Sequence, residues 1–196
     1  RSHSSYLEDT SDFLRVIEKI NEGPNLPVNA LLVTMDAISL YDNIPNDEGL
    51  DSLGEALEER QNSKVPTGFI KRMFEIVLEW NLFVFHEATY LQKVGVAMGV
   101  HPAPNYADIF MAKRIDNRIR ELAEEMKNQN MQNLPLLLLL KRFLDDIFLV
   151  FQGTTKQIHQ LLDKINAIHK SYQFTMEHTS NKEENEADKC DCTPKQ

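Results

Sequence analysis

Two adjacent carboxylates, Asp145 and Asp146, stand between two apolar stretches that have the composition of strands. Phe143 and Leu144 precede them, and an almost wholly hydrophobic run begins at Ile147. An unpaired charge buried in such a setting costs several kcal/mol, so two charges together indicate either a turn open to water or a bound cation. The pattern therefore predicts a metal site at the tip of a hairpin, with a solvated turn as the alternative.

A third carboxylate occupies a similar setting far upstream. Asp36 ends the short apolar run that begins at Leu31. If that strand lies beside the Asp145-Asp146 hairpin, the three carboxylates converge at one edge of a sheet. Such a set suits two-metal phosphoryl transfer, in which cations about 3.5–4 Å apart activate the attacking oxygen and stabilise the leaving oxygen. Because all the ligands are oxygens, we expect Mg²⁺ or Mn²⁺ rather than zinc.

Between the two acidic segments lies a glycine- and proline-containing run at residues 95–104, Gly-Val-Ala-Met-Gly-Val-His-Pro-Ala-Pro. The first acidic segment continues from Asp36 as Asp-Ala-Ile-Ser-Leu-Tyr-Asp-Asn-Ile-Pro, and the last contains Phe-Leu-Asp-Asp. The order and wording of these segments resemble the palm of a reverse transcriptase, most closely that of Penelope-like retroelements. Their palms carry Ser-Leu-Tyr-x-Asn-Ile-Pro, Gly-x-Ala-Met-Gly…Ala-Pro and a Leu-Asp-Asp or Ile-Asp-Asp core. The resemblance covers about residues 6–178, with a departure at Val100 and His101, where a small hydroxyl residue and often a proline are expected.

This resemblance implies that the parent protein is an RNA-directed DNA polymerase, a nucleotidyltransferase of retrotransposon type that uses two Mg²⁺ or Mn²⁺ ions. Asp36 would bridge both metals, and Asp145 would supply the second bridging carboxylate. Asp146 would be a weaker or outer ligand, and the Ala37 carbonyl an additional oxygen ligand. The implied partners of the full-length protein are an RNA or DNA template-primer and dNTPs.

The resemblance also assigns nucleotide binding to Ala37, Tyr41, Met98 and Gly99. Tyr41 follows Asp36 by five residues and matches the position whose ring lies under the nucleotide sugar and excludes a 2′-hydroxyl, which would favour deoxynucleotides. Core packing is the alternative for this tyrosine, because tyrosine is often partly buried. The glycines of the 95–99 segment would let the backbone approach a nucleotide closely, since glycine lacks a Cβ and reaches positive φ freely.

Local patterns predict a fold of the α+β class, with the split βαβ antiparallel sheet of polymerase palms and helices packed on one face. Asp9-Thr10-Ser11 predicts a helix start and Gly23-Pro24 its end. Further helices are expected from Asn46-Asp47, from Pro66-Thr67 to about Trp80, behind Pro102 and Pro104, and from Thr154 or Thr155. A hairpin of residues 82–86 and 89–92, divided by Glu87-Ala88, and a strand from Tyr172 to Met176 complete the prediction.

The helix behind Pro102 carries an apolar stripe at helical spacing, which we expect to lie in the core. The stripe consists of Ala107, Phe110, Met111, Ile115, Ile119 and Leu122. We expect the basic residues Lys113, Arg114, Arg118 and Arg120 to be solvated rather than in contact with a template.

With 196 residues and 42% hydrophobic content, the chain has material for one sizeable core. We expect an N-terminal helix and connector at residues 1–30, corresponding to a fingers/palm junction, a palm domain at residues 31–178 and an acidic, disordered tail at residues 179–196. The longest apolar run, Leu136–Leu140, is too short to span a bilayer, so no membrane partner is expected. Cys190 and Cys192 lie in the polar tail and favour a reducing, intracellular setting, nuclear or cytoplasmic.

The formal net charge of −9 argues against strong nucleic-acid binding by these residues alone, because binding normally uses Lys and Arg contacts to phosphate. We therefore expect the fragment by itself to be inactive or weakly active, and no pattern specifies an oligomeric state. Two alternatives stay open. One is a catalytically inactive palm, domesticated or decayed, that serves as an interaction scaffold. The other is a cation-binding α+β domain unrelated to polymerases.

Overall fold

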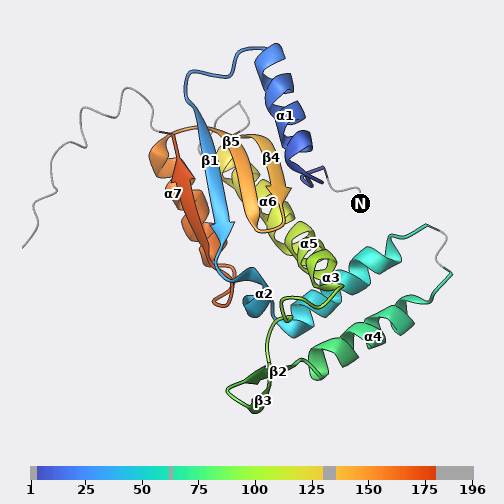
Figure 1. Ribbon diagram of the computed structural model, residues 1–196. Helices are drawn as coiled ribbons and strands as arrows, with labels where there is room; N and C mark the ends of the chain where they lie inside the picture. Colours follow the sequence, from blue (N-terminus) through green and yellow to red (C-terminus); the bar gives the residue numbers. More distant parts are fainter. Residues whose placement is uncertain (1–3, 62–63, 130–135, 180–196) are drawn as a thin grey trace, which may run out of the picture.

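A four-stranded antiparallel sheet carries the elements on which the candidate site depends (Figure 1). The computed structural model describes residues 4–61, 64–129 and 136–179. The strand order is β4-β5-β1-β6, with β1 at Ala30–Ala37, β4 at Leu137–Phe143, β5 at Asp146–Gln152 and β6 at Phe174–His178. Along β1 buried and exposed side chains alternate from Leu31 to Ala37, as expected of a strand that has only one face on the core.

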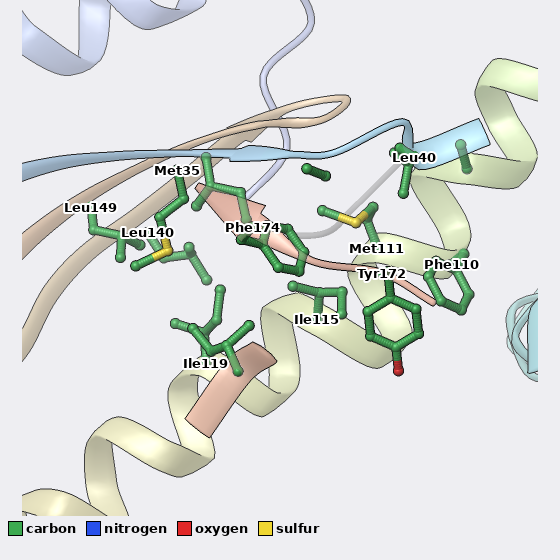
Figure 2. Close-up of a cluster of buried hydrophobic side chains, with 14 of the residues drawn as sticks. Met35, Leu40, Phe110, Met111, Ile115, Ile119, Leu140, Leu149, Tyr172 and Phe174 are labelled. Carbon is green, nitrogen blue, oxygen red and sulfur yellow. The ribbon is translucent and has the colours of Figure 1, made fainter. Parts of the chain in front are cut away.

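Helices cover the buried face of this sheet. The longest unit is continuous and consists of α5 Ala103–Phe110, a π-helical segment η1 Met111–Asp116 and α6 Asn117–Gln129, and α7 Thr155–Asn166 lies beside α6. Figure 2 shows Ile115 and Ile119 packed below Met35 of β1 and Leu149 of β5. The predicted apolar stripe is confirmed as core, because all six of its residues are buried.

The helical unit departs from the predicted regular spacing at η1, where hydrogen bonds span five residues instead of four. Its basic residues form ion pairs with acids of the protein: Lys113 with Glu59, Arg114 with Glu55, and Arg118 with both Glu121 and Glu125. Arg120 donates a hydrogen bond to the Ser4 hydroxyl.

The N-terminal helix α1, Thr10–Glu22, lies on the other face of the sheet. Its cap is the predicted one, since the Asp9 side chain accepts a hydrogen bond from the Asp12 N–H at 2.9 Å and the helix ends at Gly23. Phe13 of α1 meets Phe148 of β5 edge to face, with ring centroids 5.2 Å apart. The α+β class with an antiparallel sheet is confirmed. The prediction that the helices pack on one face is wrong, because α1 packs on the opposite face through Phe13 and Phe148.

Three helices and a small hairpin form the part of the molecule below the sheet in Figure 1. They are α2 Leu40–Asn43, α3 Asn46–Glu58, α4 Thr67–Glu79, and the separate two-stranded sheet of β2 Leu82–Phe85 and β3 Ala88–Leu91. The predicted starts of α3 and α4 are confirmed. The hairpin turn falls at His86-Glu87, one residue before the predicted position, because a two-residue turn of this kind requires positive φ at both central residues, here 45° and 65°.

The start of α7 and the strand that follows it can both be compared with the prediction. The helix starts with a capping box in which Thr154 and Gln157 bond each other's backbone, which selects Thr154 over Thr155 as the cap. The strand begins at Phe174 rather than Tyr172. Tyr172 precedes the strand and is buried against Phe110, with ring centroids 5.4 Å apart.

The first residue of the predicted tail, Thr179, lies just past the end of β6 and is hydrogen-bonded to β1. The Thr179 N–H donates to the Leu32 carbonyl at 3.0 Å, and its hydroxyl accepts from the Leu32 N–H. The rest of the predicted tail, residues 180–196 with Cys190 and Cys192, lies outside the described residues. Within the described ranges, no helix is both long and apolar enough to cross a membrane.

Candidate active site

Asp36 and Asp146 are directly opposite each other on neighbouring strands. The antiparallel register of β1 and β5 pairs these two residues, which are more than 100 positions apart in the sequence. Directly opposite residues project from the same face of a sheet with Cα atoms about 4.5–5.5 Å apart. Both side chains are exposed on the face opposite the main helical layer, which we call the open face. Helix α1 covers part of this face, where Phe13 packs on Phe148. The structure therefore brings the upstream acid to the downstream pair.

Asp145 occupies the two-residue turn between β4 and β5. Phe143 pairs with Asp146, so the turn consists of Leu144 and Asp145, and Leu144 has a left-handed φ of 53°. Burial raises the pKa of Asp146, and the negative charges of Asp145 and then Asp36 raise it further. The three carboxylates thus share one electrostatic environment at the end of the hairpin.

The donor chemistry of this cluster fits a hard divalent cation. All three side chains offer carboxylate oxygens, and the repulsion that raises the pKa of Asp146 is what a bound cation relieves. Across residues 4–61, 64–129 and 136–179, no group of three His, Cys, Asp or Glu side chains stands in position to hold a metal ion without rearrangement.

Tyr41 lies beside this cluster on α2. Its ring is half-buried and packs against the core, as the core-packing alternative expects. Burial raises the pKa of its phenol, and the charge of Asp145 raises it further, so the ring also belongs to the electrostatic neighbourhood of the turn. The Tyr41 carbonyl accepts a hydrogen bond from the Val96 N–H at 2.8 Å. This bond ties the glycine-containing segment to the helix that carries the tyrosine.

The two glycines of that segment have different surroundings. Gly95 has φ 78°, and a Cβ on it would lie 2.3 Å from the Tyr41 carbonyl oxygen and 2.7 Å from the Asp42 carbonyl group. Its N–H donates to the Asn46 side chain at 3.0 Å. Gly99 has φ 92° with nothing within 4 Å of a Cβ, and Met98 beside it is 75% exposed. The close backbone approach at Gly95 is therefore to α2, whereas Met98 and Gly99 face open space.

Ala37, the last residue of β1, is buried and pairs with Phe174 of β6. The open face next to it has a cavity of about 300 Å³ that includes Asp36 and Asp146. Its other lining residues are Thr34, Met35, Thr175, Met176 and Glu177. A more apolar cavity, also about 300 Å³, lies between α1 and the sheet, and Asp146 contributes to its wall.

Two features of the site were missed by sequence reasoning. Glu177 of β6 is a further carboxylate on the open face, and it is exposed and lies opposite Thr34. The only sequence signal for this position is that Phe174 and Met176 are apolar, which places the residues between and after them on the other face. Arg142 of β4 is fully buried beneath the turn. A charged residue inside an apolar strand pattern was the available signal for it.

Comparison with known proteins supports the fold. No protein-family model and no curated protein sequence matches this chain. Among solved structures, the telomerase of Candida tropicalis is similar with a TM-score of 0.67 and 16% identity, over 92% of this chain and 34% of that one. The telomerase of Candida albicans, in complex with a TWJ fragment of telomeric RNA, has a TM-score of 0.66 and 14% identity, over 92% and 32%. The BmCPV RNA-dependent RNA polymerase at its elongation state has a TM-score of 0.52 and 13% identity, over 76% and 15%.

These similarities establish a polymerase-type fold. The chain spans about a third of the length of the telomerase chains that it matches.

Proposed function

We propose that this chain is the palm of a reverse transcriptase and carries out two-metal nucleotidyl transfer in a longer parent protein. The observation that carries the proposal is the pairing of Asp36 with Asp146 beside the Asp145 turn, on the open face of a polymerase-type sheet. Two observations support a single site for the three motifs: the Val96 N–H is bonded to the Tyr41 carbonyl, and burial and then the charge of Asp145 raise the pKa of the Tyr41 phenol. The wording of the motifs favours a Penelope-like retrotransposon origin, and the two cysteines favour an intracellular protein.

In this proposal each residue has a distinct task. Asp36 and Asp145 would hold two Mg²⁺ or Mn²⁺ ions, with the Ala37 carbonyl as a further oxygen ligand and Asp146 as an outer one. When bound, such ions lower the pKa of the attacking hydroxyl and stabilise charge on the leaving oxygen. Tyr41 occupies the space that a ribose 2′-hydroxyl would need. This steric exclusion selects deoxynucleotides.

The open part of the glycine segment completes the nucleotide site. Met98 and Gly99 face free space, so the backbone there can approach a dNTP without a Cβ at residue 99. Anchoring at Gly95 keeps the segment against α2 while its outer part stays accessible. The partners proposed for the parent protein are dNTPs and an RNA or DNA template-primer.

The metal ligands are tested by neutralising single carboxylates. Asp36→Asn and Asp145→Asn should each abolish primer extension by the parent protein and weaken Mn²⁺ binding by this chain, as measured by titration calorimetry. Glu177→Gln is the matched control, because it removes the same charge from the same open face without removing a proposed ligand. Equal losses in the three variants would mean that only the net negative charge of the face matters, and the proposal would be wrong.

Sugar selection is tested at Tyr41. Tyr41→Ala should raise incorporation of ribonucleotides relative to deoxynucleotides in single-nucleotide assays on the parent protein, whereas Tyr41→Phe should keep the wild-type ratio because the ring remains. Asp36→Ala should abolish incorporation of both, since the carboxylate acts electrostatically and the ring sterically. If Tyr41→Ala leaves the ratio of ribonucleotide to deoxynucleotide incorporation unchanged, Tyr41 has a role in core packing and not in sugar selection.

Binding of nucleic acid by this chain alone is expected to be weak and salt-sensitive. A net charge of −9 leaves few phosphate contacts, and each contact that does form adds to the slope of affinity against salt. Fluorescence anisotropy with a labelled primer-template over a salt series measures both quantities. Nanomolar affinity that does not change with salt would contradict the proposed division of tasks between this palm and the rest of the parent.

A second candidate function is an inactive palm that serves as an interaction scaffold. It is favoured by the β2–β3 hairpin, in which every residue of both strands is exposed, including Phe83, Val84 and Phe85. Apolar surfaces of this kind often mark protein contacts. Metal-dependent primer extension by the parent protein would exclude this alternative.

A further inference from the structure

A buried charge network lies directly beneath the proposed catalytic turn. Arg142 of β4 has no exposed surface. Its Nε donates to the Asp116 carboxylate, at 3.0 and 3.2 Å from the two oxygens. Its Nη2 donates to the Asp108 main-chain carbonyl at 3.2 Å and lies 2.9 Å from the Asp108 carboxylate, whose Oδ1 is buried and accepts no hydrogen bond from the described residues. A buried guanidinium is tolerated only when it is paired and hydrogen-bonded, and this one has two carboxylates within reach.

The remaining arm of the guanidinium reaches the turn itself. Nη1 of Arg142 donates to the Leu144 carbonyl at 2.8 Å. Leu144 is the residue immediately before Asp145, and its φ of 53° lies in the left-handed region, which is unfavourable for a residue with a Cβ. Such conformations persist where the surroundings hold them, and they gather at functional sites.

The carboxylate of Asp116, which accepts from Arg142, lies at the end of η1 and also contacts the N-terminal segment. Local sequence patterns predict neither the π-helical segment nor this contact. The π-helical segment η1 ends at Asp116, and Asp116 and Ile115 are both buried. The N-terminal segment closes the network: the Ser5 hydroxyl donates to Asp116, the Arg142 N–H donates to the Ser5 carbonyl at 2.7 Å, and the Leu7 N–H donates to the Arg142 carbonyl at 2.9 Å. Residues from three distant parts of the chain thus fix one arginine.

We propose that Arg142 is a positioning residue that pins Leu144 in its left-handed conformation and thereby aims the Asp145 carboxylate. The catalytic meaning of this role rests on the proposed function, whereas the conformational role does not. Lysine cannot replace the arginine, because a single ammonium lacks the planar fork that reaches Asp116, Asp108 and the Leu144 carbonyl together. Glycine at position 144, in contrast, adopts the left-handed conformation without help.

This difference gives a rescue experiment with three variants: Arg142→Lys, Leu144→Gly and the double variant. In metal-free chain, the backbone chemical shifts and the H–N–Cα–H coupling of residue 144 report its φ by NMR. Arg142→Lys should lose the left-handed signature, Leu144→Gly should keep it, and the double variant should regain it. Retention of the signature in Arg142→Lys, or its absence in the double variant, would overturn the proposal.

The functional consequence is measured separately. Mn²⁺ affinity of the chain, and incorporation by the parent protein, should fall about 10–100-fold in Arg142→Lys, as is typical when a residue that orients a ligand is lost, and should recover in the double variant. A structural defect alone would not be reversed by adding a glycine. If the wild-type chain binds no Mn²⁺ and the parent adds no nucleotide, the proposed function fails, but the φ of residue 144 still decides the role of Arg142.

A measurement on the wild-type chain covers the case in which Arg142→Lys does not fold. A guanidinium held by Asp116, Asp108 and the Leu144 carbonyl rotates slowly, so the Nη protons of Arg142 should give separate, slowly exchanging NMR signals. Averaged signals from a freely rotating group would overturn the proposal without any variant.

Discussion

Gly95→Ala should destabilise the protein far more than Gly99→Ala, although both glycines have positive φ. The values are 78° for Gly95 and 92° for Gly99, so an alanine is strained at either position. The surroundings differ. A Cβ at residue 95 would lie 2.3 Å from the Tyr41 carbonyl oxygen, while a Cβ at residue 99 would have nothing within 4 Å. Gly99→Ala therefore measures the backbone conformation alone.

The expected magnitudes follow from these contacts. A residue with a Cβ at positive φ costs about 1–3 kcal/mol, and this applies to both variants. Gly95→Ala adds overpacking against backbone that cannot rotate away, about 1–3 kcal/mol. Moving the segment off α2 also loses the bond from the Val96 N–H to the Tyr41 carbonyl, about 0.5–1.5 kcal/mol. The difference between the variants is then about 1.5–4.5 kcal/mol, a large part of a typical domain stability of about 5–15 kcal/mol.

Urea unfolding followed by far-UV circular dichroism measures this difference. Both variants should unfold with the slope of the wild-type chain, and the midpoint of Gly95→Ala should lie well below that of Gly99→Ala. Equal midpoints would refute the reasoning, because they would show that a Cβ at residue 95 does not clash with the Tyr41 carbonyl oxygen. In the parent protein, Gly95→Ala should also disturb sugar selection, since displacing the segment displaces Tyr41.

Three further outcomes are expected. Thr154→Ala should lower the free energy of unfolding by about 1 kcal/mol through loss of the α7 capping box, while Thr154→Ser keeps it, as measured by urea unfolding. Arg118→Ala should change the unfolding free energy by less than about 1 kcal/mol, because its ion pairs with Glu121 and Glu125 are exposed; a larger loss would show a structural role for them. Burial, and then Glu48, raise the pKa of Tyr172 from 10.0 to about 12, so its contribution to stability is present below about pH 10 and is lost as the pH rises through about 12. Tyr172→Phe should remove that part of the alkaline loss in pH-dependent thermal unfolding.

The sequence by itself determined those features that depend on neighbouring residues. The short apolar run that begins at Leu31 predicted a strand ending at Asp36, and Asp9 and Gly23 predicted both ends of α1, because composition and caps act over a few residues. The three motifs and their order also led to a polymerase-type fold, which the solved structures support. The type of each main element was therefore predictable from local chemistry.

Only the tertiary structure decided how these elements meet. The pairing of Asp36 with Asp146 depends on strand register, and a shift of one residue would place Asp36 on the buried face. Tyr172 lies outside β6, and its ring packs against Phe110, which is 62 positions away in the sequence. Arg142, Asp116 and Ser5 come from distant positions, and no local pattern links them, because a buried charge is satisfied by whichever partners the fold brings to it. The geometry of the Asp145 turn is thus set by contacts that no short stretch of sequence contains.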